Sequence, residues 1–564
     1  MGDGNRSPCC GLNIVRTNLV LCSITGFGGT SCIAHHFRSC PQPMKPFSLA
    51  IVVFVTALVG QVAESQTARL FETDDGAKPL NAVDTRVFVR LQGQGIKPAD
   101  LCSDEVFVRR VYLDVIGTLP EPKETKAFLE DHSPGKRAAL IDALLGRDEF
   151  AEYWAMKWCD VLRVKAEFPI NLWPNAAQAY HRWVRDSIRD NKPYDQFVRE
   201  LLTSSGSNFR TPPVNFYRAI QGREPATIAK AVALTFMGTR IENWPEKRRS
   251  DMAAFFSRIA YKHTGEWKEE IICLDPKSAD AMKATLPDGA SVQIGPDDDP
   301  RQAFADWLTG PNNPWLARAV VNRVWYWLLG RGIVQEPDDI RPDNPPSNPE
   351  LLAYLEKELV SAHYDLKHIY RLILNSRTYQ QSSIPRSAGP KADALFAYYP
   401  VRRLDAEVLI DALCWIGGEG ESYTSAIPEP FTFIPTDQRT ISLPDGSITS
   451  QFLEMFGRPA RDTGLASERG TQPTDAQRLY LLSSADVQRK IDRSPRLRSI
   501  HAMLWRDWPA LIGEIYLTVL SRYPTPDEEK AAEAYFHTAK LQLSQAEGDL
   551  AWALINSKEF SYRH

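Results

Sequence analysis

The segment FGRPARDTGLASERG holds the best candidate residues for binding an anion. Its charged side chains lie among three glycines and a proline, outside any helical pattern. Planar guanidinium groups suit sulfate, phosphate or carboxylate ligands and often bind them in bidentate geometry. The alternative is an internal lattice, in which the arginines and the acids satisfy one another and hold the loop against the core. The candidate ligand-binding residues of this segment are Arg458, Arg461, Asp462, Glu468 and Arg469.

The segment EPDDIRPDNPPSNPE concentrates oxygen ligands in a proline-rich turn. Hard cations prefer such oxygens, so Asp338, Asp339 and Asp343 are candidates for binding calcium, although the spacing and glycine of an EF-hand are missing. If the protein hydrolyses polysaccharide, Asp338 or Asp339 is the candidate acid or base. Arg341 and Asn344 join the candidate ligand-binding residues. The alternative is that these side chains cap backbone groups of the turn.

Other chemistries lack their sequence signatures. The histidines after the first 65 residues form no HxH, HxxH or HExxH pair, so local spacing predicts no zinc or copper site. The sequence has no GxSxG motif and no phosphate-binding glycine pattern, which argues against the commonest serine hydrolases, kinases and dinucleotide enzymes. A net charge of −4, with Lys and Arg spread along the chain, argues against nucleic-acid binding. No cofactor is expected.

The first part of the chain has the pattern of a targeting segment. Residues 1–43 hold five of the nine cysteines and show neither helical nor strand periodicity, so they lie upstream of the true start or are disordered. The stretch MKPFSLAIVVFVTALVGQVAESQT then gives a positive residue, a short apolar core and a small-x-small cleavage site. This order predicts a signal peptide at 44–65, a start at Met44 rather than Met1, and an exported protein, periplasmic or extracellular. The alternative is an N-terminal membrane anchor. The apolar core is shorter than the ~20 residues of a membrane span, so a signal peptide is favoured and no stable span is expected after cleavage.

The cysteines that follow the signal segment have no CxxC spacing. In an oxidising compartment they allow two disulfides, and the spacing does not decide the pairing. These residues are Cys102, Cys159, Cys273 and Cys414.

Helical periodicity dominates the rest of the sequence and predicts a mainly α protein with two helical domains. A linker at 66–78 leads to the first domain at 79–263. The second domain covers 300–564 and contains an irregular insertion at 417–470. Between the domains, 264–299 has the pattern of a short strand, a β-hairpin and a linker.

Several local patterns refine this organisation. Capping boxes mark helix starts at 347–350, 474–477 and 525–528. The sequence ISLPDGSITS at 441–450 predicts a second hairpin. Tryptophans in strongly apolar helical segments are expected in the core rather than on a sugar-binding surface. These are Trp154, Trp158, Trp325, Trp327 and Trp552.

The segment RRLDAEVLIDAL places Arg403, Glu407 and Asp411 at four-residue steps. Such spacing is typical of a solvated helix face with ion pairs between successive turns.

Long stretches of the sequence resemble the paired PSCyt and PSD domains, the domain-of-unknown-function families 1549 and 1553 of planctomycetes and related bacteria. The resemblance covers nearly all of residues 80–564. It implies an exported protein, often encoded beside a sulfatase-like partner family, and no established reaction. Many members carry an N-terminal cytochrome c module, which this chain lacks. The stretches that carry the resemblance are FVRRVYLDVIGTLPEPKETKAFL, NKPYDQFVRELLTSSGSNFRTPPVNFYRA, NPWLARAVVNRVWYWLLGRGIVQEPDDIRPDNPPSNPELLAYL and DLAWALINSKEF.

One family motif is missing from the stretch TFMGTRIENWPEKRRSDMAAFF. Family members commonly have CxxCH here, the attachment signature of c-type haem. Gly238, Arg240, Trp244 and the AAFF at 253–256 fit the family frame, but the cysteines and histidine are absent. Covalent haem is therefore not expected, and Arg240 to Arg249 is interpreted as a turn between packed helices.

These observations lead to one functional expectation with two alternatives. The expected role is a binding or scaffolding module at the cell envelope, for an anionic polysaccharide or a secreted sulfatase-like partner. The first alternative is a hydrolase that acts on polysaccharide with paired carboxylates. The second is a redox-associated protein that has lost its haem motif.

Overall fold

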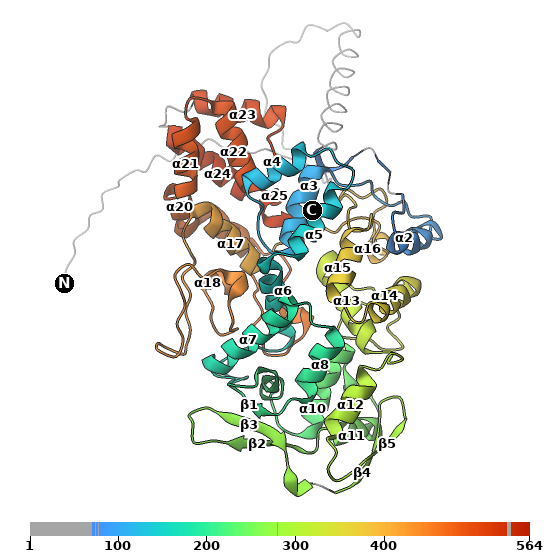
Figure 1. Ribbon diagram of the computed structural model, residues 1–564. Helices are drawn as coiled ribbons and strands as arrows, with labels where there is room; N and C mark the ends of the chain where they lie inside the picture. Colours follow the sequence, from blue (N-terminus) through green and yellow to red (C-terminus); the bar gives the residue numbers. More distant parts are fainter. Residues whose placement is uncertain (1–69, 74, 77, 279, 539–542) are drawn as a thin grey trace, which may run out of the picture. The chain divides into compact units, whose positions relative to one another are not determined.

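The computed structural model describes residues 70–564 apart from 74, 77, 279 and 539–542. The upstream segment 1–43, the predicted signal peptide 44–65 and the first part of the predicted linker lie outside the described residues. The described chain is mainly α-helical with a few short strands, which confirms the predicted fold class (Figure 1). No described helix combines the length and the apolar character that crossing a bilayer requires.

The first run of helices extends from α2 to α11. Asn81 caps α2 and Ser103 caps α3 through side-chain acceptors, and Pro174 occupies the first turn of α7. The bounds are α2 Ala82–Gln92, α3 Asp104–Val115, α4 Pro122–Glu130, α5 Lys136–Leu145, α6 Asp148–Val161, α7 Pro174–Arg189, α8 Tyr194–Thr203, α9 Asn215–Arg218, α10 Pro225–Val232 and α11 Glu246–Ala254.

The turn predicted at Arg240 to Arg249 is only partly present, because α11 begins at Glu246 and includes Arg249. A π-helical turn, Ala233–Met237, extends α10 and ends at Gly238 in the left-handed conformation. A Cβ at Gly238 would lie 3.1 Å from the Pro337 carbonyl, so the backbone comes close to a neighbouring segment here. A 3-10 helix at Ile241–Asn243 then leads to α11, which ends at Ala254, so Phe255 and the next residue are buried in a turn rather than on a helix.

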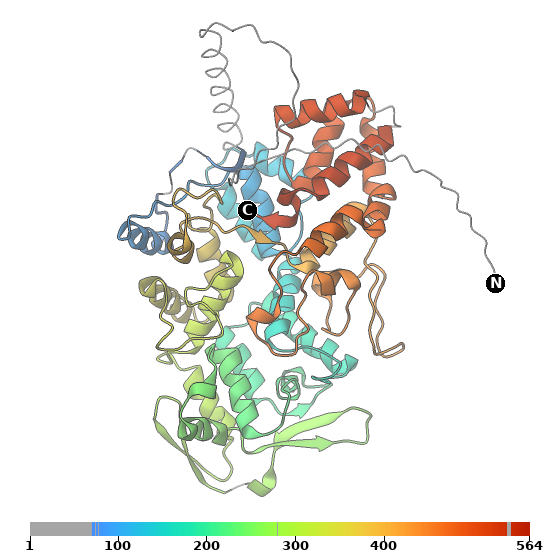
Figure 2. The same cartoon turned by 180° about the vertical axis from the view of Figure 1, so that it is seen from behind.

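Two small antiparallel sheets follow, and they confirm the predicted strand and hairpin (Figure 2). The first has the order β1-β3-β2, with Tyr261 opposite Ile272 and His263 opposite Glu270. The second is the hairpin β4-β5. The bounds are β1 Gly206–Ser207, β2 Ile259–His263, β3 Glu270–Leu274, β4 Met282–Thr285 and β5 Ser291–Ile294.

The second run of helices packs α22 against α21, α23 and α24 and brings the end of the chain, β7, beside β6 (Figure 1). The bounds are α12 Pro300–Leu308, α13 Leu316–Leu329, α14 Pro349–Ser361, α15 Leu366–Leu374, α16 Pro390–Ala394, β6 Arg402–Arg403, α17 Ala406–Gly417, α18 Gln451–Met455, α19 Asp475–Ser483, α20 Ala485–Asp492, α21 Pro495–Leu504, α22 Trp508–Leu520, α23 Pro526–Thr538, α24 Leu543–Ile555, α25 Lys558–Ser561 and β7 Tyr562–Arg563. The predicted division into two domains at 264–299 stays a prediction.

Two of the three predicted capping boxes are present. Thr474 and Gln477 exchange both capping hydrogen bonds, and so do Thr525 and Glu528. The capping box predicted at 347–350 is wrong, because Asn348 rather than Ser347 is the capping residue and accepts from the Leu351 amide. Helix starts were thus predictable within one residue.

The hairpin predicted at 441–450 is also wrong. This segment contains a 3-10 helix at Thr440–Ser442 followed by turns. The Asp445 carboxylate accepts from the amides of Ala166 and Ser447, so side-chain acceptors take the place of a partner strand. Such local bonds compete with strand pairing.

Tryptophans form much of the core around α6. Trp154 and Trp158 are buried on one face of this helix, and each contacts the Trp327 ring, at centroid distances of 5.6 and 5.3 Å. Trp325 is buried, and Trp552 packs against the core half-buried. The four cysteines of the described chain are free thiols.

Candidate functional site

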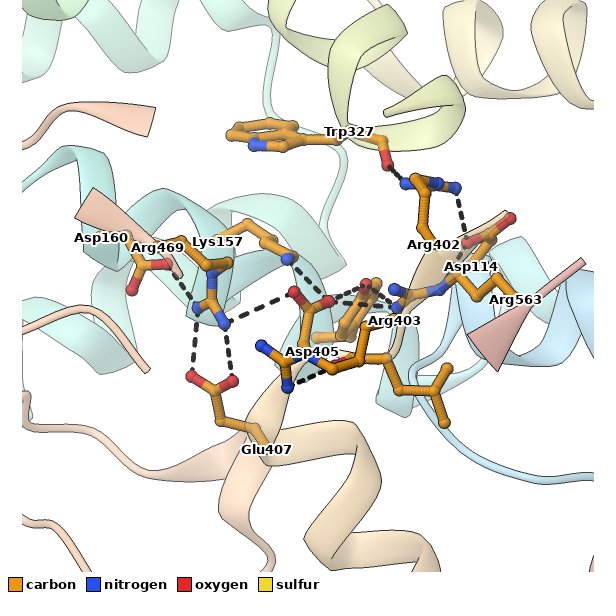
Figure 3. Close-up of polar contacts among 12 residues, drawn as sticks. Asp114, Lys157, Asp160, Trp327, Arg402, Arg403, Asp405, Glu407, Arg469 and Arg563 are labelled. Carbon is orange, nitrogen blue, oxygen red and sulfur yellow. Dashed lines mark hydrogen bonds and ion pairs between the residues drawn. The ribbon is translucent and has the colours of Figure 1, made fainter. Parts of the chain in front are cut away.

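The arginine side chains of the loop predicted as a ligand site are buried, and Figure 3 shows Arg469 between Asp160 and Glu407. The Nε of Arg461, a fully buried residue, donates to an Asp160 oxygen at 2.9 Å. Arg469 donates to the second Asp160 oxygen at 2.6 Å and to Glu407 at 2.7 Å. The loop closes on itself, because the Gly470 amide donates to the Gly457 carbonyl at 2.9 Å.

The other charged residues of the loop are also bonded within the chain. The Arg458 guanidinium donates to backbone carbonyls of the 445–448 turn and lies 3.6 Å from Glu407. Asp462 accepts from Lys165 at 2.8 Å, and Glu468 accepts from the Asp462 amide at 2.8 Å. This geometry corresponds to the internal lattice rather than to an open anion site.

The lattice continues into a larger cluster that we call the interior charge network. Asp405 accepts from Lys157 at 2.8 Å and from Arg563 at 3.1 Å. Arg563 also pairs with Asp114 at 2.9 Å, and Arg402 donates to the same carboxylate at 3.4 Å. The network consists of Asp114, Lys157, Asp160, Arg402, Arg403, Asp405, Glu407, Arg458, Arg461, Arg469 and Arg563.

The protonation of the network follows from burial and charge. Burial raises the pKa of Asp405, but Lys157, Arg563 and Arg469 outweigh it and hold that pKa well below the ordinary value. Burial, with the nearby Arg469, lowers the pKa of Lys157 to about 8, although Asp405 opposes the shift. An amine with such a pKa can act as a base or a nucleophile, but this one is buried and bonded to Asp405. We therefore interpret the interior charge network as structural.

Arg403 of β6 and Glu407 and Asp411 of α17, predicted on one solvated helix face, belong to this interior, so that prediction is wrong. Glu407 pairs with Arg469, and Asp411 accepts from the Thr440 amide at 2.7 Å. Arg403 donates to the carbonyl of Gly470 at 2.6 Å. The irregular segment 417–470 folds back over this face of α17 and supplies these partners. The apolar character of AEVLIDALCWIG was the available sequence signal for burial.

The acidic turn is a closed structural turn as well. Asp338 is buried, pairs with Arg323 at 2.8 Å and accepts from the Ala466 amide at 2.6 Å. Asp339 and Asp343 each pair with Arg341 at 3.1 Å.

The amide of Asn344 completes this turn by donating to the carbonyls of Gln335 and Asp339 at 2.9 Å each. In the described part of the chain, no group of three or more His, Cys, Asp or Glu residues has a geometry that holds a metal ion. Contacts within the turn account for Asp339, Asp343 and Asn344, whereas Asp338 is held by Arg323 of α13 and by the Ala466 amide.

Sequence reasoning missed an exposed group of aromatic rings, which we call the aromatic cluster: Trp173, Trp267 and Phe431. The Trp173 and Trp267 centroids lie 4.6 Å apart, and Phe431 lies 5.4 and 5.3 Å from them. Trp267 is 60% exposed and Phe431 41%. The Lys268 ammonium lies 5.2 Å from the Trp173 ring and 5.8 Å from the Trp267 ring. Two of the three rings are thus largely exposed to solvent, and a cation lies beside them.

Three distant segments position the cluster. Trp173 directly precedes α7 with a φ of 72°, and its amide donates to the Ala166 carbonyl at 3.2 Å. Trp267 lies in the turn between β2 and β3, and Phe431 lies in a loop of the irregular segment. Because no two of these rings are close in sequence, no local motif indicated that they lie together.

Two family models match the chain. The PSCyt2 model, Protein of unknown function (DUF1549), matches residues 82–260. The PSD1 model, Protein of unknown function (DUF1553), matches residues 300–536. No curated protein and no solved structure matches. The aromatic cluster takes Trp173 from the first matched region, Trp267 from the segment between the regions and Phe431 from the second.

Proposed function

We propose that this protein, which belongs to the family that pairs a PSCyt2 domain with a PSD1 domain, is exported and binds polysaccharide through the aromatic cluster. The observation that carries the proposal is the exposed ring triad. Contiguous exposed apolar side chains are a feature of ligand and protein binding sites, whereas singly scattered ones are ordinary.

The chemistry of sugars suits these rings. The C–H face of a sugar ring is apolar and buries against an aromatic face, while the hydroxyl groups stay in water. The centroids of Trp173, Trp267 and Phe431 lie within 5.4 Å of one another, so one or two sugar units of a polysaccharide can contact all three rings. The Lys268 ammonium beside the rings favours a ligand that carries negative charge.

The proposal assigns no reaction and no cofactor. The carboxylates considered for hydrolysis are engaged, Asp338 with Arg323 and Asp339 with Arg341. A secreted protein partner is the other occupant expected for such a surface, and the experiment below separates the two.

Affinity electrophoresis of the chain from Gln66 onward tests the proposal. Native gels that contain dextran, hydroxyethyl cellulose, dextran sulfate or carboxymethyl dextran should retard the protein in at least one case. Trp267→Ala should weaken that retardation about tenfold or more, because a buried large apolar side chain contributes about 1.5–3 kcal/mol. Trp505→Ala is the matched control, since Trp505 is 47% exposed and has Arg506 over its ring at 4.5 Å.

Equal retardation of the native protein and Trp267→Ala would overturn the role of the cluster. Migration unaffected by every polysaccharide would overturn polysaccharide binding and leave the protein partner as the occupant.

A further inference from the structure

A group of cations adjoins the aromatic cluster on the β1-β3-β2 sheet, and a buried carboxylate orients it. Glu270 is buried and accepts from Arg218 Nε at 3.1 Å and from Arg223 Nη2 at 2.8 Å. The Arg223 guanidinium lies 4.3 Å from the centroid of the Tyr261 ring. The acid is thus turned inward, whereas Arg223 remains 54% exposed.

This arrangement restricts the orientation of the Arg223 guanidinium. A guanidinium that stacks on a ring and is held by one carboxylate loses little freedom when it binds an anion. The His263 ring lies 3.7 Å from Glu270 on the same side and is 80% exposed. The surface around Glu270 therefore presents more cationic than anionic groups to solvent.

The cations and the rings belong to one rigid patch. Glu270 begins β3 three residues after Trp267, a span of roughly 10 Å at most. Arg218 also donates to the carbonyl of Leu172, the residue before Trp173, at 3.1 Å. Lys268 contributes a second cation within the cluster itself.

The wider surface of the β1-β3-β2 sheet also carries more exposed positive than negative side chains. Other cations around the sheet are exposed, whereas two of the acids there are buried. The exposed cations are Arg210, Arg223, Lys262 and Lys268, the exposed acids are Glu224 and Glu266, and the buried acids are Glu269 and Glu270.

From this geometry we propose that Arg223 and Lys268 bind sulfate or carboxylate groups of the polysaccharide whose sugar rings stack on the aromatic cluster. This inference rests on the proposed function and names the class of ligand, an anionic polysaccharide. Sulfate esters and carboxylates both accept two hydrogen bonds from one guanidinium. The rings supply contact with the chain of sugars, and the cations select the substituted chain.

Binding to dextran, dextran sulfate and carboxymethyl dextran tests the proposal, because the three share one backbone. Affinities are measured by electrophoresis or calorimetry for the native chain from Gln66, the double variant Arg223→Gln, Lys268→Gln, and Trp267→Ala. The matched control is Arg496→Gln, a guanidinium stacked on Trp415 at 3.8 Å away from the patch.

The native protein should bind at least one anionic dextran about tenfold or more tightly than dextran. The double variant should lose most of this preference and keep its affinity for dextran, and added salt should weaken the native anionic complex more than the variant complex. The stronger of the two anionic arms identifies sulfate or carboxylate as the preferred group. Trp267→Ala should weaken binding to every dextran that the native protein binds.

Each contrary result has a distinct meaning. Equal native affinity for neutral and anionic dextrans, or an undiminished preference in the double variant, overturns this inference and leaves the proposed function standing. Binding to anionic dextran that survives Trp267→Ala but not the double variant overturns the aromatic role. Absence of binding to all three dextrans overturns the inference.

Discussion

At the scale of single residues, Asp160 shows why the arginine-rich loop is a structural element. Its two oxygens accept from Arg461 and Arg469, and its side chain is only 14% exposed. We expect Asp160→Asn to lower the free energy of unfolding by about 3–5 kcal/mol, because it removes the carboxylate that pairs with the buried Arg461 and one of the carboxylates that pair with Arg469. Urea denaturation at neutral pH measures this loss.

The control for this change is Asp343→Asn. Asp343 also pairs with an arginine, Arg341 at 3.1 Å, but its side chain is 72% exposed. An exposed ion pair contributes about 0–1 kcal/mol, so this variant should be close to the native protein. A similar small effect at Asp160 would contradict a structural role of the network.

His181 on α7 predicts a pH dependence. Burial lowers its pKa to about 3, with Arg461, Arg185 and Arg182 acting in the same direction. An unfolded histidine takes up a proton near pH 6.5, while the folded protein keeps this ring neutral. The free energy of unfolding should therefore fall as the pH drops below about 6.5, by up to roughly 1.4 kcal/mol per pH unit.

His181→Asn checks this expectation. Urea denaturation between pH 6.5 and 5 should give a shallower pH dependence in the variant, by close to one proton, because Asn does not titrate. His564, whose pKa burial lowers to about 4, remains in both proteins and cancels in the comparison. Identical slopes would show that His181 is protonated in the folded protein.

The same scale shows where sequence reasoning succeeds and stops. The loop arginines pair with Asp160 and Glu407, and the loop acids accept from Lys165 and from backbone amides. The near balance of arginines and acids in the loop supported only the general alternative of an internal lattice. This balance did not predict that Asp160 on α6 or Asp405 before α17 would pair with the loop arginines. Both carboxylates lie far from the loop in sequence, and no local pattern distinguishes them. The aromatic cluster was out of reach for the same reason, because long-range folding alone brings Trp173 and Phe431 together.

At the scale of elements, periodicity and capping patterns predicted the structure correctly where interactions between residues close in sequence determine it. The strand Glu270–Leu274, the turn between β4 and β5 and the caps at Thr474 and Thr525 followed from local patterns. The failed predictions for 441–450 and for the face of α17 both involve the irregular segment 417–470. There the backbone bonds to side chains of other elements, and the partners of Asp445 and Asp411 are visible only in three dimensions.

The irregular segment also explains why α17 was misjudged. A helix with charges at four-residue steps is solvated when one face is open to water. Here the loop that follows α17 returns over that face, and each charge of the helix meets a partner from the loop, as Glu407 meets Arg469. Charge spacing alone does not distinguish a solvated face from one that a later segment covers.

At the scale of the whole molecule, the interior charge network joins the two regions that the family models match. Asp114, Lys157 and Asp160 come from the first region, and their partners Arg402, Asp405 and Arg469 come from the second. Two further bonds from α3 add to this, because Arg110 donates to the carbonyls of Tyr379 and Gln381 at 2.8 Å each. Buried charges that lose their partners are costly, so neither region is expected to be stable alone.

A cut between the two regions tests this dependence. We insert a site-specific protease sequence after Ser278, between the two small sheets, and cleave the folded protein. The fragments should elute together in size exclusion at micromolar concentration and separate only in denaturant, because the buried pairs of Asp160 and Asp405 cross the cut. The same cut in Asp160→Asn should release the fragments at a lower urea concentration. Fragments that separate in native buffer would mean that the two regions are independent domains, and the aromatic cluster would then be divided between them.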